Sequence, residues 1–261
     1  MPTMPDRRRP IASAKGGFRA ELRDFVRFVK HPSPGPRLPR AAMPALAADW
    51  VGGISLRRIF RWVLFLWGLN LLVLGPLAAG AAWLLGADHR FNPVDLPWFL
   101  ALAWAPVVEE LMFRLGMRRP GAAIWLIPAF AAIVMYGSGL YTGIFLALSL
   151  ALLAWPGMPG VRWKFAWSRR YRKVFPWVFH LLTLSFAVLH LLNFNLDAAV
   201  WWLMPLLILP QWGTGLVLGW MRVRTGIGAS MLMHALFNAG PMVLVWLLMQ
   251  AMPADMSVPG L

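Results

Sequence analysis

Long apolar runs alternate with short polar or basic segments along the chain. Seven runs approach or exceed about 20 residues, the length at which an α-helix crosses the hydrocarbon core of a bilayer. They cover residues 62–86, 97–117, 120–136, 139–155, 175–193, 198–221 and 228–252. This pattern predicts an all-α fold, a polytopic transmembrane helix bundle of about seven spans embedded in lipid.

Composition supports a membrane protein and removes several chemistries. Of the 261 residues, 59% are hydrophobic and 13% are charged, whereas a soluble domain has about 25% charged residues. Cysteine is absent, so disulfides, thiolate nucleophiles and cysteine-bound metals are excluded. The net charge of +15 comes from basic blocks between the apolar runs. Such blocks are typical of membrane topology, and no nucleic-acid partner is expected.

Lysine and arginine are distributed unevenly among the predicted connections. Thirteen precede the first run, one lies in the first connection, three lie at 114–119, six at 156–174 and two at 222–224. The other connections hold none, so rich and poor connections alternate. By the positive-inside rule, the N-terminus is expected in the cytoplasm of a bacterial-type plasma membrane and the C-terminus on the other side. Arg7-Arg8-Arg9 is not followed by the apolar core of a cleavable signal peptide.

Composition also divides the chain into a basic, proline-rich cytoplasmic arm, a membrane domain and a short tail, which cover residues 1–61, 62–252 and 253–261. Within the arm, Phe18, Leu22, Phe25 and Val29 recur at helical spacing. This spacing indicates a short helix on the anionic membrane surface. A disordered tether that only sets the orientation of the first span explains the arm equally well.

Two adjacent glutamates, Glu109 and Glu110, interrupt the apolar run over 97–117 and are the only acidic residues inside a predicted span. A charge in the membrane costs about 2.5 kcal/mol or more, so it is usually kept for a function. Arg114 follows at helical spacing and can pair with Glu110. A structural Glu–Arg pair explains one glutamate but leaves Glu109 without a partner. Pro106 is expected to kink the helix and open space beside the carboxylates.

Two other spans each carry a histidine with a neighbour on the same helix face. Phe186 lies four residues before His190, and Asn238 lies four residues after His234. A lone histidine in an apolar helix is usually a packing residue. Here three spans of one bundle carry polar groups that are costly in a membrane, and a single shared site explains all three. Counting about 1.5 Å per residue, with the fifth span starting near His180, places this site in the cytoplasmic half of the bilayer.

The remaining histidines, His31, His89 and His180, have no such neighbours and are expected at the interface or in the cytoplasm. A serine between glycines, Ser138, is expected in a loop and not as a nucleophile. The chain also contains no His-Glu-x-x-His or Gly-x-Ser-x-Gly sequence, which excludes the hydrolase classes that these motifs mark.

The three polar constellations together resemble a known family. Residues 106–114 (Pro-Val-Val-Glu-Glu-Leu-Met-Phe-Arg), 186–190 (Phe-Ala-Val-Leu-His) and 234–238 (His-Ala-Leu-Phe-Asn) are similar, in order and spacing, to the three motifs of the CAAX prenyl endopeptidase and bacteriocin-processing family (CPBP, or Abi). The resemblance covers about residues 62–252. It implies an intramembrane endopeptidase that cleaves membrane-associated substrates, for example prenylated CAAX-type proteins or leader peptides.

The resemblance also implies roles for the site residues. Glu109 would polarise a water molecule with the help of His190, and His234 with Asn238 would stabilise the oxyanion. Supporting roles would fall to Glu110, Arg114 and Phe186. No cofactor is favoured under this interpretation.

Two alternatives remain open on sequence grounds. Glu109, His190 and His234 could hold a zinc ion with an open fourth position, although no His-x-x-x-His pair lies on one helix to support a metal. A non-catalytic immunity or scaffold protein, or a transporter, would also place polar groups inside a bundle. A transporter is expected to have inverted repeats, and none is visible.

Overall fold

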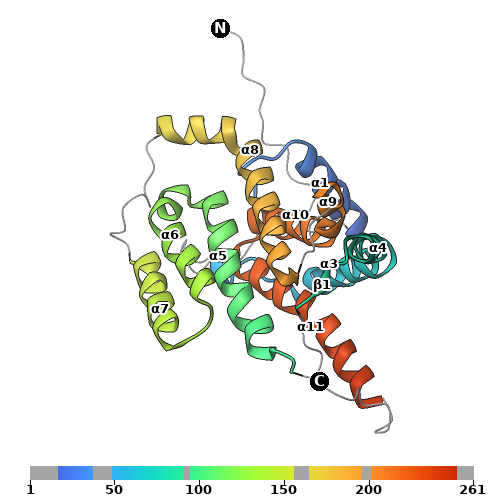
Figure 1. Ribbon diagram of the computed structural model, residues 1–261. Helices are drawn as coiled ribbons and strands as arrows, with labels where there is room; N and C mark the ends of the chain where they lie inside the picture. Colours follow the sequence, from blue (N-terminus) through green and yellow to red (C-terminus); the bar gives the residue numbers. More distant parts are fainter. Residues whose placement is uncertain (1–16, 38–48, 91–94, 156–164, 196–200, 252–261) are drawn as a thin grey trace.

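The computed structural model describes residues 17–37, 49–90, 95–155, 165–195 and 201–251. Helices form most of this part of the chain, so the predicted all-α fold is confirmed (Figure 1). The α-helices are α1 (Phe18–Lys30), α3 (Leu56–Leu69), α4 (Gly75–Leu85), α5 (Ala105–Arg118), α6 (Pro120–Tyr136), α7 (Leu140–Ala154), α8 (Phe165–Leu189), α9 (Met204–Leu207), α10 (Leu209–Arg224) and α11 (Ile227–Ala251). The shorter elements are the π-helical turns η1 (Asn70–Leu74) and η2 (Leu100–Trp104), the 3₁₀ turns η3 (His190–Asn193) and η4 (Trp201–Leu203), and the antiparallel strands β1 (Asp88–His89) and β2 (Phe194–Asn195).

Several helices are suited to a membrane. Within the described residues, three helical stretches are long and apolar enough to cross one, namely Leu56–Leu85, Arg169–Asn193 and Ile227–Ala251. A fourth is added if the pair Trp201–Leu207 and Leu209–Arg224, bent by 46°, is one span. The apolar helices Leu126–Tyr136 and Leu140–Ala154 are shorter. The chain is therefore an integral membrane protein, and the count of seven spans stays a prediction.

Proline shapes two of the helices in the way its chemistry requires. Pro76 and Pro106 each lie at the start of an α-helix, directly after the π-helical turns η1 and η2. Proline has no N–H to donate, and its ring clashes with the carbonyl one turn earlier. A wider π turn before the ring relieves that clash. The kink expected at Pro106 therefore takes the form of a π turn.

Helix α8 differs from the expectation. The fifth span was expected to start near His180, but the helix runs continuously from Phe165 to Leu189 and contains Pro176. Figure 1 shows the first turns of α8 running across the end of the bundle before the helix bends and descends into it. A proline inside a helix is a common cause of such a bend. The helix therefore begins before the predicted run over 175–193, because the chain bends at Pro176 without leaving the helical conformation.

Part of the N-terminal arm is helical and packs on the bundle. Helix α1 places Phe28, 1% exposed, against Phe179 of α8 with ring centroids 5.0 Å apart. Glu21 is also buried and accepts hydrogen bonds from Arg58 and from the Trp62 indole. The apolar face of α1 therefore contacts protein, where the sequence left a membrane-surface helix and a disordered tether open.

A second segment of the arm, residues 49–53, makes backbone-to-backbone contacts with the connection between α10 and α11. A Cβ built on Gly228 would lie within van der Waals overlap of the Trp50 carbonyl, and one on Gly226 would overlap the Asp49 carbonyl. Across the same contact, a Cβ on Gly53 would overlap the Thr225 carbonyl. Glycine is needed at these three positions because two backbones approach here more closely than any side chain permits.

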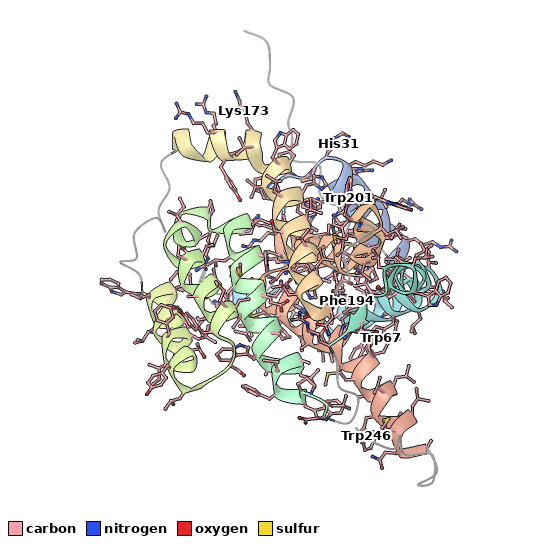
Figure 2. The ribbon with its side chains drawn as sticks, viewed as in Figure 1. His31, Trp67, Lys173, Phe194, Trp201 and Trp246 are labelled. Carbon is pink, nitrogen blue, oxygen red and sulfur yellow. The ribbon has the colours of Figure 1, made fainter. Side chains whose placement is uncertain are left out.

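Basic residues gather at one end of the bundle. Arg118 and Arg119 end α5, Arg222 and Arg224 end α10, and Lys173 lies near the bend of α8. The Tyr171 hydroxyl donates to the Gly116 carbonyl, and Arg224 binds Asp24 of α1 at 2.8 Å. We call this end, covered by α1, the basic face. Figure 2 shows Lys173 and His31 on this side and Trp246 on the opposite side.

Candidate active site

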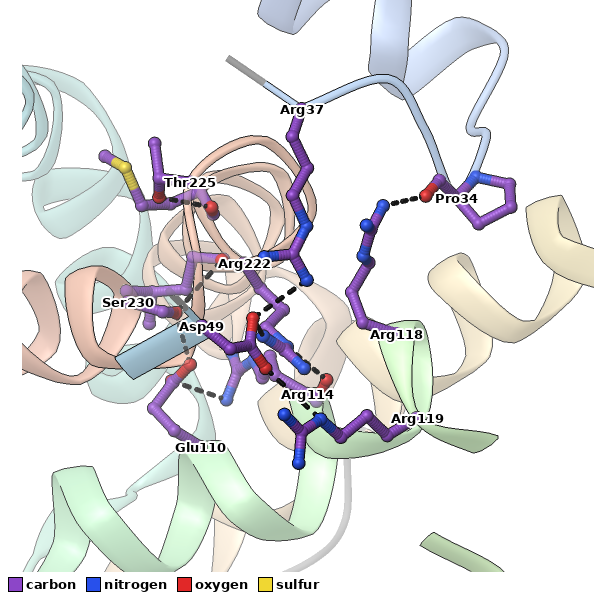
Figure 3. A network of polar contacts seen from close by, with 12 residues as sticks. Pro34, Arg37, Asp49, Glu110, Arg114, Arg118, Arg119, Arg222, Thr225 and Ser230 are labelled. Atoms are coloured by element: carbon purple, nitrogen blue, oxygen red, sulfur yellow. Dashed lines mark hydrogen bonds and ion pairs between the residues drawn. The ribbon is translucent and has the colours of Figure 1, made fainter. Parts of the chain in front are cut away.

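A buried glutamate organises the polar interior of the bundle. Glu110 on α5 is 0% exposed and accepts hydrogen bonds from the Ser230 hydroxyl and from His234 Nδ1, the latter at 3.2 Å. Arg114 Nη1 lies 3.1 Å from Glu110 Oε1, one helical turn away (Figure 3). Three partners on two helices therefore compensate one buried negative charge, as a buried carboxylate requires.

A phenylalanine lies between the cation and both histidines. Phe186 on α8 is 0% exposed, and the Arg114 guanidinium carbon lies 3.8 Å from its ring centroid. The ring centroids of His190 and His234 lie 4.7 Å and 5.8 Å from that of Phe186. A guanidinium over an aromatic face gains cation–π attraction, more so when both are desolvated. Phe186 thus fixes the relative positions of three site residues.

The neighbouring glutamate has a different environment. Glu109 Oε2 lies 3.9 Å from His234 Nε2, and it has no hydrogen-bond partner among the described residues. A separation of 3.9 Å is too long for a direct hydrogen bond. The Glu109 side chain is 17% exposed and lines a cavity of about 290 Å³ together with His190. Glu109 is therefore the carboxylate that a bound molecule can reach.

Hydrogen bonds assign the protons of the two histidines. His234 Nδ1 faces the Glu110 carboxylate, and His190 Nδ1 lies 2.8 Å from the Phe186 carbonyl. Both partners accept hydrogen bonds, so each neutral imidazole carries its proton on Nδ1 and keeps Nε2 as an acceptor. As an imidazolium, His234 would also donate through Nε2.

Asn238 satisfies a carbonyl that the π turn leaves free. In η2 the Ala105 N–H bonds the Leu100 carbonyl, five residues back. The next bond in this pattern would run from residue 106 to the Ala101 carbonyl, but Pro106 has no N–H. Asn238 Nδ2 donates to the Ala101 carbonyl at 2.9 Å instead. One of the two amide N–H groups of Asn238 is therefore committed to holding α11 against η2.

The cavity lies toward the end of the bundle away from the basic face. Its lining includes Leu100 and Trp104 of η2, Gly137 after α6, and His190 with Asn193 of η3. The position of His190 in the cytoplasmic half of the bilayer was predicted from a span starting near His180. In the structure His190 lies in the last turn of the helical stretch Arg169–Asn193, and its depth in the bilayer stays a prediction.

His89 lies closer to the site than the sequence indicated. It stands on β1, which pairs with β2 directly after η3, and its ring centroid lies 4.8 Å from that of Phe194. Burial, with a smaller contribution from nearby His190, lowers the pKa of His89 below its usual 6.5. The strand pairing of two-residue segments that brings these histidines together has no recognisable signal in the sequence.

Ser230 was also missed, although a signal exists. Ser230, His234 and Asn238 follow one another at intervals of four on α11 and therefore share one helix face. The serine hydroxyl lies within hydrogen-bond distance of both the Glu110 carboxylate and the Leu218 carbonyl, and it has one proton to donate. A search for polar residues in register with His234 would have found it.

The predicted metal ligands are only partly brought together. Glu109 and His234 approach each other, but no group of three His, Cys, Asp or Glu side chains in the described part of the chain is arranged to hold a metal ion. A zinc site needs at least three protein ligands at about 2.0–2.3 Å from the ion. As placed here, the three residues do not fit zinc, and we derive no step through a metal.

Fold and site together define a class, a helical integral membrane protein with a carboxylate–imidazole cluster beside a cavity. Residues 93–240 match the family model described as type II CAAX prenyl endopeptidase Rce1-like. The match covers more than half of the 261 residues, so the chain belongs to this family and, in general terms, to the intramembrane endopeptidases. The resemblance found in the sequence is thereby confirmed. No curated protein and no solved structure matches the chain.

Proposed function

We propose that this protein hydrolyses peptide bonds of membrane-associated polypeptides with a water molecule activated by Glu109. The observation that carries the proposal is the contrast between the two glutamates. Glu110 is fully buried and fully paired, whereas Glu109 lines the cavity 3.9 Å from His234 Nε2. A paired carboxylate holds structure, and a carboxylate at a cavity within reach of a water molecule can act as a general base.

The spacing of these groups supports a position for the attacking water. The attacking water would lie in the cavity that Glu109 and His190 both line and would donate one proton to the Glu109 carboxylate. Glu109 would take one proton as the water oxygen attacks the carbonyl carbon. Later the C–N bond breaks and the same proton passes to the leaving amine. His190, with Nε2 as an acceptor, would orient the water from the other side.

The developing negative charge needs donors that point into the cavity. Asn238 has one amide N–H beyond the bond to Ala101, and His234 can donate as an imidazolium held by Glu110. Donors fixed in a dry site stabilise an oxyanion more than water does. Arg114, Ser230 and Phe186 act on this chemistry indirectly, by fixing Glu110 and both imidazole rings.

The assignment of Glu109 is tested by comparing membrane proteomes. Cells that express the protein are compared with cells that express Glu109→Gln, which keeps the size and removes the base. Terminal peptides that depend on the intact glutamate identify substrates, and cleavage of one of them is then measured with purified enzyme in liposomes. We expect Glu109→Gln to remain folded in detergent and to lose turnover. Normal turnover of the variant would exclude Glu109 as the base.

Metal dependence is tested on the same purified enzyme. We expect activity to survive exhaustive chelation and the metal content to be far below one ion per chain. If Glu109, His190 and His234 bind zinc, chelation should remove activity and zinc should restore it. Replacing either histidine should then also lower the metal content. One tightly bound zinc per active chain would refute the metal-free mechanism.

A further inference from the structure

The cavity beside Glu109 reaches the surface away from the basic face. Leu192 of η3 and Leu100 of η2 line it and are 65% and 40% exposed. Gly137 and Asn193, also in the lining, follow the ends of α6 and α8 that lie farthest from the basic residues. A molecule that enters the cavity would therefore come from this end of the bundle.

The opposite route, from the basic face to Glu109, is filled by side chains. Leu111, Leu115 and Met117, which follow Glu109 along α5 toward the basic face, are 0%, 1% and 0% exposed. Arg114 and Arg222 fill the space beside them and are both 0% exposed. Arg222 donates to the Arg114 carbonyl and binds Asp49 at 2.7 Å (Figure 3). Interiors packed in this way leave no path for a polypeptide.

Charge indicates which end faces the cytoplasm. Around the open end, among the residues that the structure describes, Arg90 is the one basic residue of the connections, and it donates to Asn195 of β2. The basic face holds the ends of α5 and α10, the start of α8, and α1. The positive-inside rule, by which basic connections stay in the cytoplasm, assigns the basic face to the cytoplasmic side.

From these observations we propose that the active cavity opens to the extracytoplasmic side of the membrane. Resting on the proposed function, this inference names a substrate class: membrane-anchored polypeptides whose cleaved segment lies at the outer membrane surface. The lining by Leu100, Trp104 and Leu192 favours an apolar side chain beside the cleaved bond. At about 290 Å³, the cavity lies at the lower end of the range of about 300–1,000 Å³ for ligand pockets.

The absence of cysteine allows a direct test in intact cells. Leu192→Cys places a thiol on the cavity lining, and Lys30→Cys places one at the exposed end of α1. Both are treated with a membrane-impermeant sulfonated maleimide before and after permeabilisation. We expect Leu192→Cys to react fully in intact cells and Lys30→Cys only after permeabilisation. Asp88→Cys, exposed on β1 and outside the cavity lining, provides a second probe of the open end if Leu192→Cys does not fold.

Two results would overturn the inference. One is reaction of Leu192→Cys or Asp88→Cys only after permeabilisation, together with reaction of Lys30→Cys in intact cells. The other result is that Asp88→Cys reacts, whereas Leu192→Cys folds but stays unreactive even in detergent. This result would mean that the cavity is closed. Labelling does not depend on turnover. Normal turnover of Glu109→Gln would therefore refute the proposed role of Glu109 but would leave the inferred open side of the cavity unchanged.

Discussion

Glu109 and Glu110 have different surroundings because successive residues of an α-helix are rotated by about 100° around its axis. Glu110 points at α11 and meets His234 and Ser230, whereas Glu109 points at the cavity. From its spacing, the sequence predicted that Arg114 pairs with Glu110, and the structure shows this pair at 3.1 Å; the catalytic role of Glu109 stays a prediction. The sequence could not predict that Arg114 and both histidines pack against Phe186, because this contact depends on how three separate helices pack.

At the residue scale, the observed structural role of Asn238 and its proposed catalytic role can be tested separately. Asn238→Ala leaves the Ala101 carbonyl without its donor, a loss of about 1–3 kcal/mol in the free energy of unfolding. If the second amide N–H serves the oxyanion, turnover should also fall by about 10²-fold. Thermal unfolding in detergent and cleavage in liposomes measure the two effects separately.

Pro106→Ala provides the control for that experiment. Alanine supplies the N–H that proline lacks, so the double variant Asn238→Ala, Pro106→Ala can satisfy the Ala101 carbonyl from the backbone. We expect the double variant to recover stability relative to Asn238→Ala while its turnover stays low. Recovery of turnover together with stability would mean that Asn238 only supports η2.

At the element scale, helices α8 and α10 approach through glycine. Gly215 and Gly219 lie four residues apart on one face of α10, a spacing that permits close helix contacts in membranes. A Cβ on Gly215 would lie 3.0 Å from Phe186, and one on Gly219 would lie 2.8 Å from Phe179. This contact holds Phe186 between Arg114 and the histidines, so it bears on the site as well as on the fold.

Substitution of Gly219 tests the contact. Gly219→Ala should lower the melting temperature, because overpacking of a filled core costs about 1–3 kcal/mol. Gly68→Ala is the matched control, since Gly68 lies in α3 with nothing within 4 Å of the added carbon. Alanine favours helix over glycine by about 1 kcal/mol, so the control should be neutral or slightly stabilising. Equal melting temperatures for the two variants would contradict close packing at Gly219.

Apolar runs predicted the elements better than their irregularities. The helices found at Pro120–Tyr136, Leu140–Ala154 and Ile227–Ala251 lie within a residue or two of the predicted runs. The break between α9 and α10 and the passage of α8 through Pro176 were not predicted. Hydropathy indicates the length of an apolar segment. A bend in that segment depends on which neighbouring groups form hydrogen bonds with the backbone groups that it frees.

At the scale of the whole molecule, Asp49 joins the arm to the bundle. It binds Arg222 at 2.7 Å, Arg37 at 2.8 Å and Arg119 at 3.5 Å. Burial opposes its charge, but the three guanidinium groups, Arg222 foremost, lower the pKa of Asp49 from 3.8 to about 2. A carboxyl group with a lowered pKa stabilises the fold above its unfolded pKa, and this stabilisation is lost as the pH falls through the folded value.

Asp49→Asn should therefore destabilise the protein in a pH-dependent way. At pH 7 the variant leaves the buried Arg222 without its charged partner, and removal of one member of a buried pair typically costs about 3–5 kcal/mol. The difference in melting temperature from the unmodified protein should be largest above pH 4 and should shrink as the pH falls toward 2. A difference that is constant from pH 7 to pH 2 would show that the ion pairs of Asp49 do not cause it.

The docking of the arm has a consequence for biosynthesis. Asp49 and Arg222 are separated by 173 positions in the chain, and Asp24 and Arg224 by 200. The arm leaves the ribosome first, yet its binding site is complete only after α10 and the start of α11 have been made. The arm must therefore stay undocked, with its apolar face uncovered, while nearly the whole bundle is inserted. Contacts of such sequence separation form late and slowly, so closure of the basic face is expected to be the last step of assembly.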